Sequence, residues 1–320
     1  TQYMAKYPTR IVVLKCMDGR IHIPFATKTP LGIITPIRNL GGMFDMGWPY
    51  LSEIVFNAVM DSVMGGNDVI IINTYHYSKS NKKYGCAGFN YDCDSAIRSA
   101  FYVSSQIKEL FGSQGEAVYP LVWGIETDED AIIIHGDQNK KINLAEYRFR
   151  DDETLLSDLF TLYPDMKPSM VKDIFPLVKG NIEHIQEMKQ NDIRLGVEHT
   201  EWIMCLGRGF DFLHVPNVAL IIGPYSPDLK SPIVKAASII KSNMEKGRIP
   251  SDGFLLLTSS PYWEIGADKA RAKVKSSFLN EFACGIIKQE LPDLYDRMYK
   301  IKSVLSWRTR KLEILQFEHP

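Results

Sequence analysis

Short apolar runs rich in β-branched residues recur along the first part of the chain and are separated by segments of helical character. Strands are predicted at residues 10–14, 32–37, 69–73, 118–126 and 131–135. A helix is predicted after Pro49, where apolar residues recur at one-face spacing, and another at residues 92–110. Strands interleaved with helices predict an α/β fold, with a mainly parallel sheet flanked by helices.

The middle of the chain follows a different pattern. Residues 142–189 are more polar and helical, and three prolines are expected to break the helices there, namely Pro164, Pro168 and Pro176. The order of the first part then returns, with a strand that reaches Cys205, a strand at 218–222, a helix after Pro232 and a strand at 254–258. A helical connector therefore separates two similarly ordered halves.

Matching positions in the two halves lie at a nearly constant separation. Cys16 and Cys205 are 189 residues apart, Pro49 and Pro232 are 183 apart, and residues 70–72 and 255–257 are 185 apart. One order at one offset indicates an internal duplication. We expect residues 1–141 to form the first half, residues 142–196 the connector and residues 197–320 the second half.

Composition narrows the range of partners. The chain has 320 residues, of which 45% are hydrophobic, and its 37 Lys and Arg nearly balance its 38 Asp and Glu. This balance gives no reason to expect a nucleic acid or an anionic membrane as partner, so the expected ligand is small. No apolar run approaches the roughly 18 residues of a membrane span, and no signal-peptide pattern is present. We expect a cytoplasmic protein with reduced thiols.

Residues with metal-binding chemistry follow the predicted strands. Cys16, Asp18 and Arg20 come just after the first strand, and His76 comes just after the strand at 69–73. Side chains at the carboxyl ends of parallel strands meet at one edge of a sheet. Two thiolates and one imidazole form a tetrahedral zinc shell with one vacancy, and Cys16, His76 and Cys86 provide this set.

Several motifs in order give a specific resemblance. They are C-x-D-x-R at 16–20, I-R-N-x-G-G at 37–42, a strand that ends in His76, C-x-G at 86–88 and V-W-G-I-E-T-D at 122–128. This series resembles the β-class carbonic anhydrases over residues 10–135. Most of that family has a shorter spacing from His to Cys than the one between His76 and Cys86. In the second half, Cys205 is followed by Leu206-Gly207-Arg208 and not by a counterpart of Met17-Asp18-Gly19-Arg20, so that copy is degenerate. The longer spacing and the degenerate second half resemble the carboxysomal shell branch.

The resemblance implies a mechanism and roles for individual residues. Cys16, His76 and Cys86 would bind one Zn²⁺ per chain, and the activity would be reversible hydration of CO2 to bicarbonate and a proton by zinc-bound hydroxide. Asp18 would accept a hydrogen bond from the zinc-bound water, and Arg20 would keep Asp18 ionised. In some members the equivalent aspartate closes the fourth zinc position instead.

The resemblance also implies an assembly and a place in the cell. The second half would stand in for a partner subunit, which makes the chain a pseudo-dimer with no second metal site, and a further homo-oligomer is compatible with this. It adds the carboxysome as a possible location. Gly41 and Gly42 would allow a close backbone approach around the active site.

Three alternatives stay open. Related proteins use the same zinc shell to hydrolyse CS2 or COS, and the loop at residues 77–85 is the sequence feature at issue. A second alternative function is a non-catalytic zinc scaffold or bicarbonate sensor. The presence of Asp18 and Arg20 argues against it. At the level of ligands, Cys93 is an alternative to Cys86.

Other polar residues have simpler interpretations. His22 and His135 are expected to be structural, and the acidic residues 128–130 are expected to form a solvated hairpin turn. Cys205 and Cys284 are expected in the core, and Asp211 with His214 has no ligand partner at a known spacing. The lysines in the loop at 77–85 are expected at the solvated surface or, alternatively, to attract bicarbonate or a partner protein; they are Lys79, Lys82 and Lys83.

Overall fold

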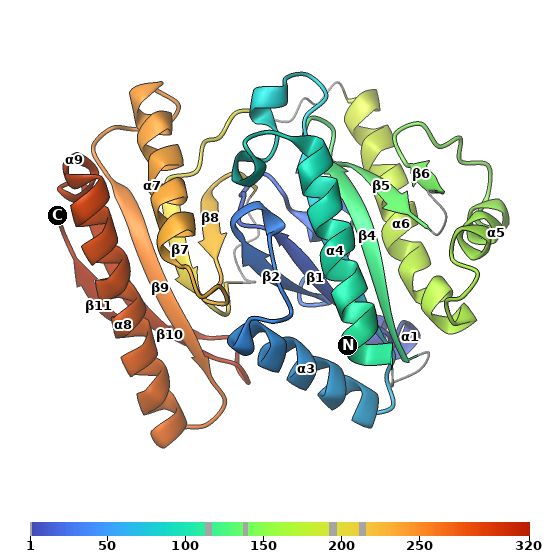
Figure 1. Cartoon of the computed structure of the whole chain (residues 1–320), viewed down its shortest axis with the longest axis horizontal. Helices are drawn as coiled ribbons and strands as arrows, with labels where there is room; N and C mark the ends of the chain where they lie inside the picture. Colours follow the sequence, from blue (N-terminus) through green and yellow to red (C-terminus); the bar gives the residue numbers. More distant parts are fainter. Residues whose placement is uncertain (1, 113–116, 137–139, 192–196, 211–215) are drawn as a thin grey trace. The chain divides into compact units, whose positions relative to one another are not determined.

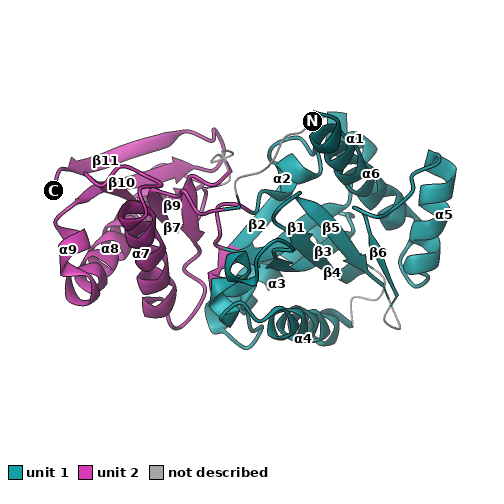
Figure 2. Ribbon diagram, turned by 90° about the horizontal axis from the view of Figure 1, so that it is seen from above, with its two compact units in different colours: residues 1–16, 21–37, 41–197 teal, residues 17–20, 38–40, 198–320 magenta. Residues whose placement is uncertain are grey.

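The chain forms two compact α/β units (Figure 2), which we describe one at a time. The computed structural model describes residues 2–112, 117–136, 140–191, 197–210 and 216–320. Unit 1 comprises residues 1–16, 21–37 and 41–197, and unit 2 comprises residues 17–20, 38–40 and 198–320. Two short segments from the first half of the sequence therefore belong to unit 2.

Unit 1 is built on a six-stranded sheet with the order β2-β1-β3-β4-β5-β6 (Figure 1). Its strands are β1 (Arg10–Cys16), β2 (Ile34–Asn39), β3 (Val69–Tyr77), β4 (Val118–Glu126), β5 (Ala131–His135) and β6 (Lys141–Asn143). Strands β1, β3 and β4 are parallel neighbours, whereas β5 and β6 add antiparallel strands at one edge. The four residues 69–72 of β3 are fully buried, as expected of a central parallel strand.

Helices cover both faces of this sheet (Figure 2). They are α1 (Gln2–Lys6), α2 (Ile23–Ala26), α3 (Pro49–Met64), α4 (Cys93–Phe111), α5 (Asp152–Leu162) and α6 (Pro168–Gln190), with short 3-10 turns η1 (Leu40–Gly42), η2 (Lys82–Tyr84) and η3 (Ala87–Phe89). Helix α4 packs on β3 and β4, and α6 contacts β5 and α2 on the other side. The core of unit 1 thus lies in two layers, one on each side of the sheet.

Helix α6 lies unusually close to its neighbours. A Cβ atom at Gly180 would lie only 2.0 Å from the Thr27 carbonyl oxygen. The next residue, Asn181, donates to the carbonyl oxygens of Ala26 and Asp130 at 2.8 Å each and accepts from the Ile132 amide at 3.0 Å. A glycine followed by a buried amide therefore lets α6 dock against backbone rather than against side chains.

Unit 2 has a five-stranded sheet with the order β11-β10-β9-β7-β8. The elements are β7 (Ile203–Gly207), β8 (Ala219–Ile222), α7 (Lys230–Glu245), β9 (Phe254–Tyr262), α8 (Ala267–Glu290), α9 (Pro292–Tyr295), β10 (Met298–Ser306) and β11 (Leu312–Glu318). Only β11 is antiparallel to its neighbour, and α7 and α8 pack side by side on one face (Figure 1). The side chains of Trp202, Ile314 and Phe317 are exposed.

The predicted fold class is confirmed. Both sheets are mainly parallel and flanked by helices, and a layout of two sheets fits duplicated halves. The predicted strands at 118–126 and 131–135 form with those bounds, whereas β3 and β9 each run four residues further than predicted. Among the described helices, none has the combination of length and apolar character that crossing a bilayer requires.

The prediction for Pro176 was wrong. Helix α6 continues through this residue, although a proline inside a helix costs about 3 kcal/mol through a lost hydrogen bond and a steric clash. Twelve residues of α6 are buried, and this packing keeps the helix continuous. The helical character also starts later than predicted, at α5, because residues 142 and 143 belong to β6.

Two glycine substitutions of the same type should have opposite effects on stability. Gly180→Ala should destabilise the fold by about 1–3 kcal/mol, because the new methyl group meets a backbone carbonyl that has no freedom to move aside. Gly285→Ala in α8, where nothing lies within 4 Å, should stabilise the fold by up to about 1 kcal/mol through helix propensity. Urea unfolding followed by circular dichroism measures both, and a stable Gly180→Ala protein would contradict the close docking of α6.

Candidate functional site

Three side chains that could bind a metal ion converge in unit 1. The Sγ atoms of Cys16 and Cys86 and a ring nitrogen of His76 all lie within 4.8 Å of one another. The three residues are 5%, 3% and 2% exposed, respectively. The structure thus brings together the three residues that the sequence proposed as ligands, and Cys93 is not part of this group.

The parallel pairing of β1 with β3 explains why Cys16 and His76 meet. Their register runs from Arg10 opposite Val69 to Leu14 opposite Asn73, so both strands end at the same edge of the sheet. Beyond the last pair, the Thr74 hydroxyl donates to the Leu14 carbonyl oxygen at 2.9 Å. The strand ends that carry the thiol and the imidazole are therefore fixed to each other by backbone and side-chain bonds.

Two glycines allow the segment after β2 to lie close to this edge of the sheet. Gly41 and Gly42 have φ values of 69° and 65°, a region that favours glycine. A Cβ atom at Gly42 would lie 3.1 Å from the Thr74 carbonyl oxygen and 3.3 Å from the Cys16 amide nitrogen. The expected close approach of this segment to the site is present.

The third residue, Cys86, reaches the site from a structured loop. The loop leaves β3 after Tyr77 and passes through the 3-10 turn η2. The Cys86 carbonyl oxygen then accepts hydrogen bonds from the amides of Phe89 at 3.2 Å and Tyr91 at 2.9 Å. Cys93 lies further on, at the first position of α4, where burial raises the pKa of its half-buried thiol.

Asp18 and Arg20 form a buried ion pair in unit 2. Arg20 donates from Nε to Oδ1 at 3.0 Å and from Nη2 to Oδ2 at 2.6 Å, and its backbone amide also donates to Oδ1 at 2.9 Å. Both residues are 5% exposed. A bidentate guanidinium contact stabilises the ionised carboxylate and sets its orientation.

Sequence reasoning missed two residues that complete this pair. The fully buried Glu201 carboxylate contacts the His199 Nδ1 atom at 2.9 and 3.0 Å, and its Oε1 accepts from the Gly19 amide at 3.1 Å. The His199 Nε2 atom lies 3.9 Å from Asp18 Oδ2. The His-x-Glu pair just before β7 was the only signal in the sequence, and no known spacing connects it to Asp18.

Backbone contacts explain why residues 17–20 belong to unit 2. The Asn217 amide donates to the Gly19 carbonyl oxygen at 2.6 Å, and the Ile221 amide donates to the Met17 carbonyl oxygen at 3.1 Å. A Cβ atom at Gly19 would lie 2.6 Å from the Ala219 carbonyl oxygen, so only glycine fits there. The second half therefore holds the segment that carries Asp18 and Arg20.

The two histidines interpreted as structural have structural partners. The His22 Nδ1 atom accepts from the Phe25 amide at 3.2 Å and so caps α2, which leaves His22 partly exposed rather than packed in the core. The His135 Nε2 atom lies 2.8 Å from the Tyr75 hydroxyl, which donates to a neutral imidazole. Burial, followed by the nearby Lys141, lowers the pKa of His135 to about 4.

Residues 128–130 lie in the turn of the β4–β5 hairpin as predicted, but the prediction that this turn is solvated was wrong for Asp130. Asp130 is buried against His184, with 3.2 Å between Oδ2 and Nε2, and Asp128 is only partly exposed and accepts hydrogen bonds from the preceding loop. Asp128 is hydrogen-bonded to Ser78 and Ser80, and Asp130 contacts His184 in α6. The local sequence does not show these partners. Lys79, Lys82 and Lys83 are exposed as expected.

Two of the remaining cysteines, Cys205 and Cys284, belong to unit 2. Cys205 is fully buried in the core of unit 2, and burial raises the pKa of its thiol. Cys284 is half-buried in α8. Asp211 and His214 lie outside the described residues.

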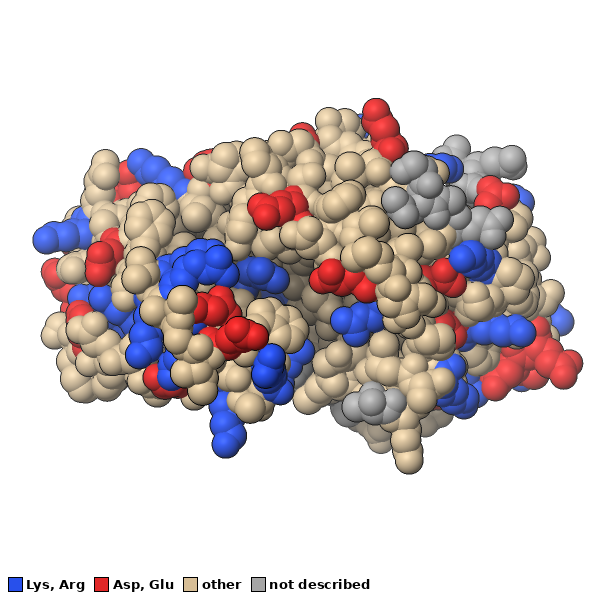
Figure 3. Space-filling view, turned by 90° about the horizontal axis from the view of Figure 1, so that it is seen from below, with Lys and Arg blue, Asp and Glu red and all other residues tan. Residues whose placement is uncertain are grey.

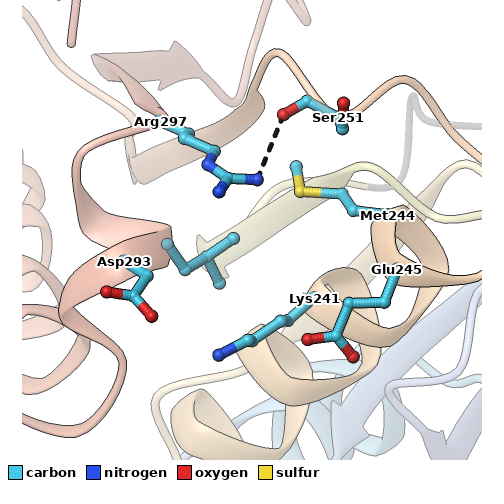
Figure 4. Close-up of a pocket in the computed structure, with 7 residues that line it drawn as sticks. Lys241, Met244, Glu245, Ser251, Asp293 and Arg297 are labelled. Atoms are coloured by element: carbon cyan, nitrogen blue, oxygen red, sulfur yellow. Dashed lines mark hydrogen bonds between the residues drawn. The ribbon is translucent and has the colours of Figure 1, made fainter.

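Charges of both signs line a cavity in unit 2. A cavity of about 250 Å³ in unit 2 is lined by two cations, Lys241 and Arg297, and two anions, Glu245 and Asp293, so its charges balance (Figure 4). Basic and acidic side chains occur together across the face drawn in Figure 3, which agrees with the net charge of −1.

The fold and the arrangement of cysteine and histidine define the β class of carbonic anhydrases. The chain belongs to the family of the carboxysome shell carbonic anhydrase, whose catalytic domain matches residues 6–192, more than half of the 320 residues. The match covers the group formed by Cys16, His76 and Cys86 and ends before β7. A search of curated proteins gave no significant match.

Three solved structures are similar to part of the chain. The β-carbonic anhydrase CcaA is 12% identical with a TM-score of 0.33, and covers 44% of this chain and 87% of its own. The carbonic anhydrases from Streptococcus mutans and Glaciozyma antarctica are each 17% identical with a TM-score of 0.25, and each covers 42% of this chain and 80% of its own. The family assignment rests on the family match rather than on these similarities.

Two histidines should give the folded state opposite dependences on pH. Although burial favours the neutral form of His199, the Asp18 and Glu201 carboxylates outweigh it and raise its pKa. The stability that His199 contributes should therefore be present below pH ~6.5 and be lost as pH rises through its folded pKa. His135, with a folded pKa of about 4, should weaken the fold as pH falls from ~6.5 towards 4.

Urea unfolding of zinc-free wild type, His199→Gln and His135→Gln from pH 4 to 9 isolates the two effects. The difference between wild type and His199→Gln should shrink at high pH. The difference between wild type and His135→Gln should shrink at low pH. Differences that do not change with pH would show that neither imidazole has a shifted pKa in the fold.

Proposed function

We propose that this chain is a zinc-dependent carbonic anhydrase that interconverts CO2 and bicarbonate with one zinc ion per chain. The observation that carries the proposal is the buried group of Cys16, His76 and Cys86 within 4.8 Å, in a chain of the carboxysome shell carbonic anhydrase family. Two thiols and one imidazole suit zinc and leave one of four tetrahedral positions for water or substrate.

A second group of side chains could also bind a metal ion, but its existing contacts favour only one zinc per chain. Among the described residues, this group is Asp18, His199 and Glu201. Asp18 is already paired with the Arg20 guanidinium, whose positive charge repels a cation, and Glu201 is already bonded to His199 and the Gly19 amide. The group in unit 1 is therefore the better zinc site.

When bound, zinc supplies Lewis acidity, which lowers the pKa of a water ligand to about 7. The chain's own residues would orient the reaction. Asp18 is two residues after Cys16, a span of at most about 7 Å, so its carboxylate can work beside the thiolate ligand. Kept ionised by Arg20, Asp18 would act only as a hydrogen-bond acceptor and would hold the proton of the reacting water away from carbon dioxide.

The second half also has a part in this proposal. It provides His199 and Glu201, which contact Asp18 and Gly19, and strand β8, which binds residues 17–20. We therefore assign residues 1–141 as the zinc-binding half, 142–196 as the connector and 197–320 as the half that replaces a partner subunit. The family also supports association with the carboxysome.

The zinc site and the reaction can be tested together. Purified protein should contain close to one zinc per chain by mass spectrometry, and stopped-flow measurements should show CO2 hydration. His76→Ala should lose zinc and activity, because two thiolates alone do not complete the site. Asp18→Asn should keep zinc and lose about 10²–10³-fold in kcat, because the amide no longer only accepts hydrogen bonds.

Cys93→Ser is the matched control, since Cys93 is the alternative ligand closest in sequence to Cys86. It should retain both zinc and activity. Full CO2 hydration by His76→Ala would end the proposal. Release of sulfide from CS2 without CO2 hydration would replace it with a hydrolase on the same fold.

A further inference from the structure

The loop at residues 77–85, which connects His76 to Cys86, is bound to the turn between β4 and β5 by two carboxylates. Asp128 Oδ1 accepts from the Ser78 hydroxyl at 2.6 Å, and its Oδ2 accepts from the Ser80 amide at 2.6 Å. Glu126 Oε1 accepts from the Lys79 amide at 3.3 Å. Three consecutive loop residues are therefore bonded to side chains of one neighbouring turn.

We propose that Glu126 and Asp128 are positioning residues, which place Cys86 in the metal site before metal binds. This inference rests on the proposed zinc function. It explains how Cys86 can share a metal site with His76 although a long loop separates the two residues. The two carboxylates act through the loop and do not touch the ligands' donor atoms in this proposal.

The carboxylates are themselves held rigidly. Glu126 is fully buried at the last position of β4, opposite Tyr77 in the parallel ladder. Its carboxylate also accepts from the amides of Asp128 at 2.9 Å and Glu129 at 3.0 Å. The Thr127 amide donates to the Tyr77 carbonyl oxygen at 2.9 Å. The turn thus extends the sheet, so the Glu126 and Asp128 side chains are held in place by the same hydrogen-bonded backbone as the strands.

The rest of the loop continues this support towards Cys86. The Ser78 hydroxyl that binds Asp128 also accepts from the Asn81 amide at 3.3 Å. Asn81 in turn accepts from the Lys83 amide through its side chain at 2.9 Å and from the Tyr84 amide through its carbonyl at 2.8 Å. A continuous chain of hydrogen bonds therefore joins the Asp128 carboxylate to the residues that directly precede Gly85 and Cys86.

Charge supports the same role. Burial raises the pKa of Asp128, but hydrogen bonds from Ser78 and Ser80 outweigh it and hold that pKa below its usual value. The anchor is ionised at neutral pH, when charge-assisted hydrogen bonds are strongest. The loop groups that donate hydrogen bonds to the two carboxylates are the Ser78 hydroxyl and the backbone amides of Lys79 and Ser80.

The test measures metal binding rather than catalysis. Asp128→Ala should weaken zinc binding, measured by competition with a chromogenic chelator, by about 10- to 100-fold, the range typical of groups that orient metal ligands. Ser78→Ala should weaken it less, and Asp128→Asn, which keeps one acceptor oxygen, should lie between wild type and Asp128→Ala. In the cobalt-substituted protein, Asp128→Ala should lose part of the thiolate-to-cobalt charge-transfer band.

Hydrogen exchange of the zinc-free protein provides a second readout. Amides of residues 77–86 should exchange faster in Asp128→Ala than in wild type. The matched control is Asp151→Ala, which removes a carboxylate that caps α5 in the same unit by accepting from the Thr154 amide at 2.7 Å. It should leave zinc affinity and the exchange of residues 77–86 unchanged.

Wild-type zinc affinity and an unchanged cobalt spectrum in Asp128→Ala would overturn the inference, as would an equal loss of affinity in Asp151→Ala. If Asp128→Ala does not fold, Ser78→Ala decides by the same criteria. Wild-type protein that binds zinc but does not hydrate CO2 would refute the proposed function and leave this inference standing.

Discussion

The parallel pairing of β1, β3 and β4 is the constraint on which the site depends. Because the three strands run in the same direction, their carboxyl ends meet at one edge of the sheet, where Cys16 and His76 lie. The same edge carries the turn after β4, which anchors the loop to Cys86. One hydrogen-bonding register therefore places two metal-binding side chains directly and the third through a tethered loop.

Burial of charge accounts for the contribution of the second half. A carboxylate as buried as Asp18 is stable only with partners, and Arg20 provides two hydrogen bonds in a fixed plane. Residues 17–20 are in turn bonded to Glu201, Asn217 and Ile221. The second half therefore supports the carboxylate that lies two residues after Cys16.

The hydrogen bonds of the loop explain how the long spacing between His76 and Cys86 is compatible with one site. A longer loop has more conformations in the absence of metal, and closing it costs entropy. Residues 78–80 bind Asp128 and Glu126, and residues 81–85 form a turn, so few conformations remain. The length of the loop and its hydrogen bonds to Glu126 and Asp128 are therefore considered together.

The sequence by itself predicted the class of fold and most strand positions, because apolar periodicity is a local property. It also predicted that Cys16, His76 and Cys86 act together, because the motifs that carry them resemble those of a known family. It did not reveal His199, Glu201 or the anchoring role of Asp128, and it misplaced a helix break at Pro176. Asp128 binds Ser78, which is 50 residues away, and Glu201 binds Gly19, which is 182 residues away. Only the tertiary structure decides which buried charges meet, because contact there follows from packing and not from spacing along the chain.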